Sequence, residues 1–148
     1  MSHRLSPIQP YFLFKSFVIM FMIQAVMVML LPLQLTASIW YQILAINVVV
    51  GVVLGWLLYK QWYHIEFSYD DDELQLKKGK NSPIIRKWKE FSQVSLVRNE
   101  YGEFKVKLHS NGGSFEIPVS RLRMQPFQFR NQTIDLVQKS ALIVSGET

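Results

Sequence analysis

Hydrophobic residues follow two different patterns along the chain, and the change comes near residue 60. Before that point, residues 11–31 hold a single charge, Lys15, and residues 39–59 hold none. A run of about 20 apolar residues is long enough to cross the hydrocarbon core of a bilayer as an α-helix. The pattern therefore predicts two transmembrane helices, over about 11–31 and about 39–59.

Aromatic residues frame the second run, with Trp40 and Tyr41 at one end and Trp56 and Tyr59 at the other. Such rings favour the boundary between headgroups and hydrocarbon. The first run is also open to interpretation as a cleaved signal peptide, but it exceeds the usual apolar length of about 7–15 residues. Its charge, Lys15, lies where a long side chain can reach back to the headgroups. A retained membrane helix is the favoured interpretation.

A short uncharged connector, residues 32–38, joins the two runs, so we expect an antiparallel helical hairpin. Every Lys and Arg lies outside this connector, toward the other ends of the runs or beyond them. By the positive-inside rule, both termini then face the cytoplasm and the connector faces outward. The sequence thus predicts a two-span protein of the cell membrane.

Polar and small residues share one face of the second run. Gly51 and Gly55 form a pair at i, i+4 spacing, and Asn47 continues the same line. Small residues let another helix approach closely, although Gly is also simply common in membrane helices. Gln24 and Asn47 lie at similar depths, and an amide without a partner is costly in hydrocarbon. We predict a Gln24–Asn47 hydrogen bond that holds the hairpin together; a functional polar site in the membrane is the less favoured alternative.

After residue 60, apolar and polar residues alternate in short runs separated by turn residues. Alternation with a period of two predicts antiparallel strands with one buried face. The strongest hairpin signal is Asn111-Gly112-Gly113. The tail then changes to helical spacing, which predicts a C-terminal helix over about 131–144 that Asn131 caps. The predicted strands cover residues 65–69, 74–76, 84–88, 94–97, 104–108 and 115–119.

This order of strands, closed by one helix, is the outline of a pleckstrin-homology-like (PH-like) barrel. The run DELQLKKG (72–79) resembles the second strand of bacterial PH-like domains, and IIRKWKEFSQVSLVR (84–98) resembles their third strand, short turn and fourth strand. The likeness covers residues 62–144, and a two-helix membrane anchor before such a domain is a known bacterial arrangement. The resemblance implies a tail and hairpin over residues 1–61 and a cytoplasmic α+β domain over residues 62–148. The full basic set that holds an inositol phosphate in eukaryotic PH domains is not found.

Charge divides the 148-residue chain at the same place. All 11 acidic residues lie at or after Glu66, while Arg4 and Lys15 are the only basic residues before Lys60. The region from Lys60 onward is mildly basic, which suits an anionic membrane surface but argues against a nucleic-acid partner. The chain has no cysteine, which excludes disulfides, thiolate metal ligands and cysteine nucleophiles.

Candidate catalytic and metal-binding groups are sparse. The run Asp70-Asp71-Asp72-Glu73 lacks the D-x-D-x-D-G spacing of calcium loops, so a solvated turn is the better interpretation. The three histidines are far apart in sequence and form no zinc motif. No signature places a nucleophile beside a base, and no phosphate-binding loop occurs. The sequence therefore predicts no enzyme, no cofactor and no metal site.

A basic run lies along the second and third predicted strands, which a hairpin turn connects, and it comprises Lys77, Lys78, Lys80, Arg86, Lys87 and Lys89. Each charge near anionic lipid contributes roughly 1 kcal/mol, but a solubilising surface would give the same run. Trp88, in its midst, is expected in the core, with an interfacial anchor as the alternative.

Together these features predict a membrane-anchored module that binds a protein partner, with anionic lipid headgroups as a second ligand, at the cytoplasmic face. The alternative is a structural or assembly subunit of a larger membrane complex, docked through the Gly51 and Gly55 face as a homo- or hetero-oligomer.

Overall fold

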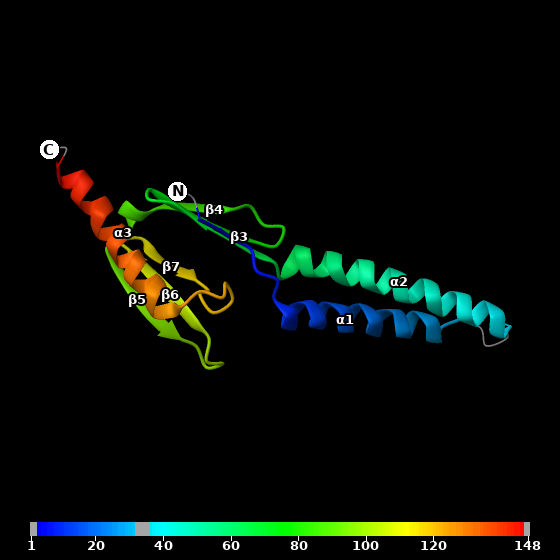
Figure 1. Ribbon diagram of the computed structural model, residues 1–148. Helices are drawn as coiled ribbons and strands as arrows, with labels where there is room; N and C mark the ends of the chain where they lie inside the picture. The colour runs from blue at the N-terminus through cyan, green and yellow to red at the C-terminus, as the bar shows by residue number, and fades with distance from the viewer. Residues whose placement is uncertain (1–2, 32–35, 147–148) are drawn as a thin grey trace. The chain divides into compact units, whose positions relative to one another are not determined.

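The computed structural model describes residues 3–31 and 36–146. It contains two compact units, shown in Figure 1. The hairpin unit comprises Ile8–His64, and the sheet unit comprises Met1–Pro7 together with Ile65–Thr148. The sequence grouped residues 1–7 with the hairpin, whereas the structure groups them with the strands.

Two antiparallel helices form the hairpin unit. Helix α1 spans Pro10–Met29 and helix α2 spans Ala37–Trp62, so each predicted transmembrane run is helical. Both helices are long and apolar enough to cross a membrane. Proline starts α1 because the first turn of a helix needs no backbone donor there. Most of the predicted connector, residues 32–35, lies outside the described residues.

The N-terminal segment forms a strand that precedes the hairpin but belongs to the sheet. Strand β1 spans His3–Leu5 and pairs antiparallel with β2, Ile65–Tyr69, with His3 opposite Tyr69. Figure 1 shows this blue strand beside the green strands of the sheet. The hairpin is therefore an insertion in the connection between two neighbouring strands. Because β1 and β2 share one sheet, both ends of the hairpin return to the same unit.

In the described part of the chain, seven strands form two antiparallel sheets, each in sequence order. The first sheet has the order β1-β2-β3-β4 and the second has β5-β6-β7. The later strands span Glu73–Lys78 (β3), Ile84–Lys87 (β4), Gln93–Arg98 (β5), Phe104–Ser110 (β6) and Gly113–Ile117 (β7). All six predicted strands are present, but the expectation of a closed barrel is not met. The chain leaves β4 through a 3-10 turn, Trp88–Glu90, and starts a separate sheet at β5.

The structure confirms two predicted turns, the acidic turn at Asp70 and the hairpin at Asn111-Gly112-Gly113. The Asp70 carboxylate accepts hydrogen bonds from the backbone N–H groups of Asp72 and Glu73, at 3.0 and 2.8 Å, and so closes the β2–β3 turn. At the β6–β7 hairpin, Ser110 lies opposite Gly113, which leaves two residues in the turn. Gly113 has a φ of +146°, a conformation that residues with a Cβ rarely adopt.

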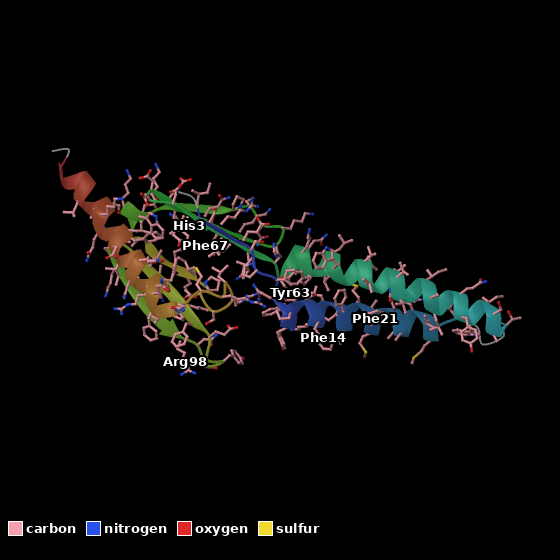
Figure 2. All side chains as sticks on the ribbon, in the orientation of Figure 1. His3, Phe14, Phe21, Tyr63, Phe67 and Arg98 are labelled. Atoms are coloured by element: carbon pink, nitrogen blue, oxygen red, sulfur yellow. The ribbon has the colours of Figure 1, made fainter. Side chains whose placement is uncertain are left out.

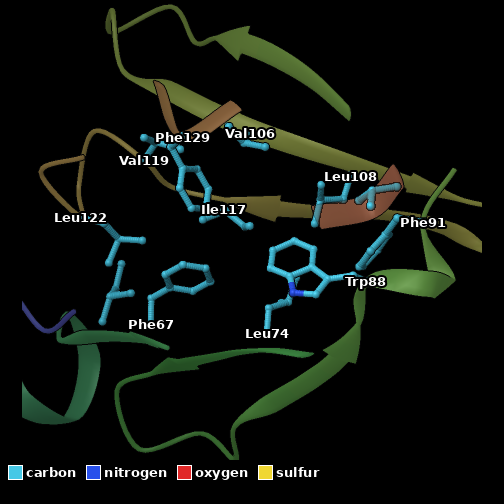
Figure 3. Close-up of a cluster of buried hydrophobic side chains, with 12 residues drawn as sticks. Phe67, Leu74, Trp88, Phe91, Val106, Leu108, Ile117, Val119, Leu122 and Phe129 are labelled. Atoms are coloured by element: carbon cyan, nitrogen blue, oxygen red, sulfur yellow. The ribbon is translucent and has the colours of Figure 1, made fainter. Parts of the chain in front are cut away.

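The hydrophobic core lies between the two sheets, and Figure 3 shows its side chains facing one another. Trp88 is fully buried there, which confirms a core position rather than an interfacial anchor. Its indole N–H donates to the Asp70 carbonyl at 2.8 Å, so its polar atom is satisfied inside the core. Phe67 and Leu74 come from the first sheet, and Leu108 comes from the second.

Helix α3 spans Pro126–Gly146 and completes this core. It begins five residues before the predicted cap, so the assignment of Asn131 as the N-cap is wrong. The physical reason is Phe129, which is 1% exposed and packs its ring 5.9 Å from that of Phe67. Burial of this ring extends the helix toward its N-terminus, and Pro126 suits the first turn.

Candidate functional site

An open groove lies where the end of β2 meets α3. Its volume is about 560 Å³, within the range of pockets that hold ligands. Its lining comes from β1, the β2–β3 turn and one face of α3, and comprises His3, Tyr69, Asp70, Asp71, Gln132, Asp135, Leu136 and Lys139. The groove lies within the sheet unit, at the end of β2 that is far from the hairpin connection.

Aromatic rings fix one wall of this groove. The ring of His3, labelled in Figure 2, stacks on Tyr69 with centroids 5.2 Å apart and an interplanar angle of 24°. Tyr69 is held from behind by Phe129 and Trp88, whose ring centroids lie 5.7 and 6.5 Å away. Burial raises the pKa of the Tyr69 phenol, so its hydroxyl stays protonated and can donate near neutral pH.

Carboxylates give the groove its charge. Asp70, Asp71 and Asp135 line it, against one cation, Lys139, which lies 3.3 Å from the Asp71 carboxylate. Hydrogen bonds from the Glu73 and Asp72 backbone lower the pKa of Asp70, so it is ionised at neutral pH. The groove is thus acidic in a chain whose net charge is +5. Aromatic and carboxylate groups together suit a cationic side chain.

Sequence reasoning found the acidic turn but not the groove. It could not bring in His3, because the three residues that become β1, just before a long apolar helix, carry no strand signal of their own. Asp135 was equally hidden, since it lies on the exposed face of α3 and its neighbours across the groove are more than 60 positions away in sequence.

The predicted basic run does not form one face. In antiparallel pairs, residues directly opposite each other point to the same side of the sheet. Lys77 lies opposite Glu66 and Lys87 lies opposite Glu73, so both share the outer face with carboxylates. Lys78 and Arg86 point to the other side, and Arg86 pairs with Glu90 at 3.2 Å. Lys80 follows in the β3–β4 turn, and Lys89 lies exposed in the 3-10 turn.

The candidate helix-packing face on α2 packs against α1 of the same chain. Gly51 and Gly55 are both buried on α2, where they receive the aromatic side chains of α1. A Cβ on Gly51 would lie 2.8 Å from the ring of Phe21, and one on Gly55 would overlap the ring of Phe17. Docking of another protein at this face would therefore require α1 to leave it.

The predicted amide pair is present in a different form. With the Gln24 amide oriented to match its surroundings, its nitrogen donates to the backbone carbonyl of Asn47 at 2.9 Å and its oxygen accepts from the Gly51 N–H at 3.1 Å. The Asn47 side chain instead donates to the Ile43 carbonyl of its own helix at 2.9 Å. The prediction of a bond between the two side chains is wrong, because Gly51 lets Gln24 reach the α2 backbone directly.

One nucleophile does lie beside a base, contrary to the sequence prediction. Ser95 Oγ is 3.0 Å from His109 Nε2, across the β5–β6 pair. Both side chains are on the outer face of the second sheet, and among the described residues no carboxylate contacts the His109 ring. A catalytic triad needs that third group to orient the imidazole. Over the same residues, no group of three His, Cys, Asp or Glu side chains is placed to hold a metal ion.

Comparison with known proteins gives no family assignment. No family model matches the chain, and no curated protein matches it.

Proposed function

We propose that this chain is a membrane-anchored, PH-like binding module, which binds a protein partner at the cytoplasmic face of the membrane. The observation that carries the proposal is the insertion of the apolar hairpin between β1 and β2. A hairpin tied at both ends to one sheet holds that sheet at the bilayer surface, and it restricts the sheet more than a single linker would.

The fold supports a PH-like identity. The six strands β2 to β7, followed by one helix, have the order of elements that the resemblance implied, although the two sheets do not close into a barrel. The helix supplies Phe129 and Val137 to the core between the sheets, as a closing helix would.

The topology supports a cytoplasmic sheet unit. Both helices run between β1 and β2, so a hairpin that crosses the membrane twice returns the chain to the side it left. The basic residues nearest the helix ends are Lys15 and Lys60, and Lys60 lies over the Trp56 ring at 5.6 Å. Positive charge at this end of the hairpin favours the cytoplasmic side.

The groove beside Tyr69 is the proposed partner site. Its carboxylates Asp71 and Asp135 and its stacked rings offer ion pairing and cation–π contact to a Lys or Arg of the partner. Arg and aromatic residues carry much of the binding energy at protein interfaces. We therefore expect one basic side chain of the partner to enter the groove.

The test is site-specific photo-crosslinking of the full chain in its native membrane. A photoreactive residue replaces Gln132 in the groove, and the control replaces Gln138, which is exposed elsewhere on α3. Asp71→Asn with Asp135→Asn should remove the Gln132 crosslink. The charge-matched control, Glu100→Gln in the β5–β6 turn with Glu116→Gln on β7, should retain it. Equal crosslinking from both glutamine positions, or no response to the Asp changes, would exclude the groove as the partner site.

A further inference from the structure

The end of β3, its turn and β4 combine exposed apolar and basic side chains. All four residues of β4 are exposed, and Ile84 and Ile85 keep 51% and 53% of their surface accessible. Two adjacent isoleucines on a strand point to opposite sides. Isoleucine is among the residues most often found fully buried, and here two consecutive ones are exposed, one on each side of the strand.

This strand is also an edge of the first sheet. β4 is the last strand in the order β1-β2-β3-β4, and it pairs with β3 through Leu76 opposite Ile84. Sheet edges in soluble proteins are usually blunted with charge, bulges or covering segments. Here the beginning of the edge strand is apolar, and its charges come only at Arg86 and Lys87.

Chain connectivity keeps this surface near the end of the second membrane helix. Only Tyr63 and His64 separate α2 from β2, so Ile65 lies within about 11 Å of Trp62 however the two units are oriented. The register places Lys78 directly opposite Ile65. The β3–β4 turn follows Lys78 immediately, and the register returns the chain to Ile84 opposite Leu76. The segment Lys78–Ile85, which we call the tip, therefore belongs to the end of the sheet from which α2 leaves.

The charges of the tip lack partners of opposite sign. Lys78 and Lys80 are exposed, and neither forms an ion pair within the described part of the chain. By contrast, Lys77 and Lys87 each lie opposite a glutamate, and Arg86 binds Glu90. Lys78, which shares one side of the sheet with Ile84, and Lys80 in the following turn are thus available to an anionic surface.

We propose that the tip is a membrane contact, in which Ile84 or Ile85 enters the headgroup boundary of an anionic bilayer while Lys78 and Lys80 lie against lipid phosphates. Apolar area together with basic charge is what binds a protein surface to anionic lipid. The inference rests on the membrane-spanning hairpin of the proposed function, but it does not depend on the partner groove. In this proposal, Lys78 and Lys80 bind the bilayer, and the other four residues of the basic run form a solvated surface.

The test uses the full chain, because a fragment that starts at residue 62 would lack β1. The chain has no cysteine, so single substitutions can be labelled without a cysteine-free background. Ile84→Cys and Ile85→Cys carry a polarity-sensitive fluorophore in nanodiscs that contain anionic phosphatidylglycerol or only neutral phosphatidylcholine. Lipids with a spin label near the headgroup serve as quenchers for the tip, and lipids with a spin label near the end of the acyl chain serve as quenchers within α2.

Two control positions separate the possible failures. Val97 lies on the second sheet and is 44% exposed, so a label on Val97→Cys reports a surface of the sheet unit outside the tip. Val48→Cys lies exposed within α2 and reports whether the hairpin is in the bilayer. A quenched Val48 label with an unquenched tip would overturn the tip proposal and leave the anchored module standing. An unquenched Val48 label would instead show that the hairpin is not in the bilayer, and it would overturn the proposed membrane anchor.

We expect quenching of the Ile84 or Ile85 label in anionic nanodiscs, with the Val97 label unquenched. Lys78→Gln with Lys80→Gln should weaken this contact by tenfold or more, roughly fivefold for each lysine removed, and Lys77→Gln with Lys87→Gln should change it little. High salt should act like the loss of the lysines, because the attraction decays over a Debye length of about 10 Å at 0.1 M. A tip label that reports low polarity without lipid quenching would mean that protein covers β4, and it would overturn the proposal.

Discussion

The side chain of Gln24 on α1 lies directly against the backbone of Gly51 on α2. Its amide bridges the Asn47 carbonyl and the Gly51 N–H, and a Cβ on Gly51 would come within 2.7 Å of that amide. One residue without a side chain thus makes room both for the polar contact and for the neighbouring ring of Phe21. At this level of the hairpin, the two helices are joined by hydrogen bonds from the Gln24 side chain to the backbone of α2. No hydrogen bond between the two amide side chains is needed.

Adding a side chain at the glycines should loosen the hairpin. Gly51→Ala and Gly55→Ala should each lower the stability of the helix pair by about 1–3 kcal/mol, the usual cost of forced overpacking. Förster resonance energy transfer between labels near the helix ends reports whether α1 and α2 are associated. Steric trapping then gives the free energy of their association. Gly112→Ala is the matched control, since a Cβ there meets nothing within 4 Å. Equal stability of the Gly55 and Gly112 variants would contradict the packing described here.

The two amides should differ sharply in their importance. Gln24→Leu removes both bonds to α2, so we expect it to weaken helix association by about 0.6 kcal/mol, the average for hydrogen bonds in membranes. Asn47→Leu should change association much less, because its side chain bonds within its own helix. The same transfer assay measures both variants. A double-mutant cycle that showed strong coupling between the side chains would contradict this geometry.

The Asp70 turn should make stability depend on acid pH. Its folded pKa lies below the ordinary value of 3.8, because the Glu73 and Asp72 backbone N–H groups stabilise the carboxylate. A lowered pKa means that this stabilisation is present above pH 3.8 and is lost as the pH falls through the folded pKa. Thermal unfolding should therefore show Asp70→Asn to be less stable than the native chain at neutral pH, with the difference narrowing in acid.

Asp72→Asn is the control for that experiment. Its side chain makes no hydrogen bond with the described residues, so at neutral pH its unfolding temperature should match that of the native chain. If the gap between Asp70→Asn and the native chain stayed constant into acid, the backbone hydrogen bonds would not be the source of the lowered pKa.

Membrane topology gives the fourth prediction. A reporter fused after Thr148 should be active in the cytoplasm, and one inserted in the connector, residues 32–38, should be active outside. Pairing of β1 with β2 requires both hairpin ends on one side, and Lys15 and Lys60 set which side that is. Activity of both reporters on the same side would mean that the hairpin does not cross the bilayer.

The sequence by itself determined the elements whose signals are local. Run length identified two helices that are long and apolar enough to cross a membrane. Period-two alternation identified strands such as β2 and β6, in which buried residues alternate with partly exposed ones, and the Asn111-Gly112 turn set the last hairpin. The sequence also indicated that Gln24 and Asn47 lie at the same level of the hairpin. It did not indicate which of their atoms form hydrogen bonds.

Only the tertiary structure decided which distant segments meet. Three residues before the hairpin become a strand because β2 offers them an open edge, and an isolated run of that length has no stability of its own. The start of α3 was set by the burial of Phe129 in a core built by both sheets, which no local capping signal could anticipate. The groove beside Tyr69 joins β1, a turn and α3, so it exists only after all three have packed. Local pattern decides what each segment becomes, and long-range burial decides what it touches.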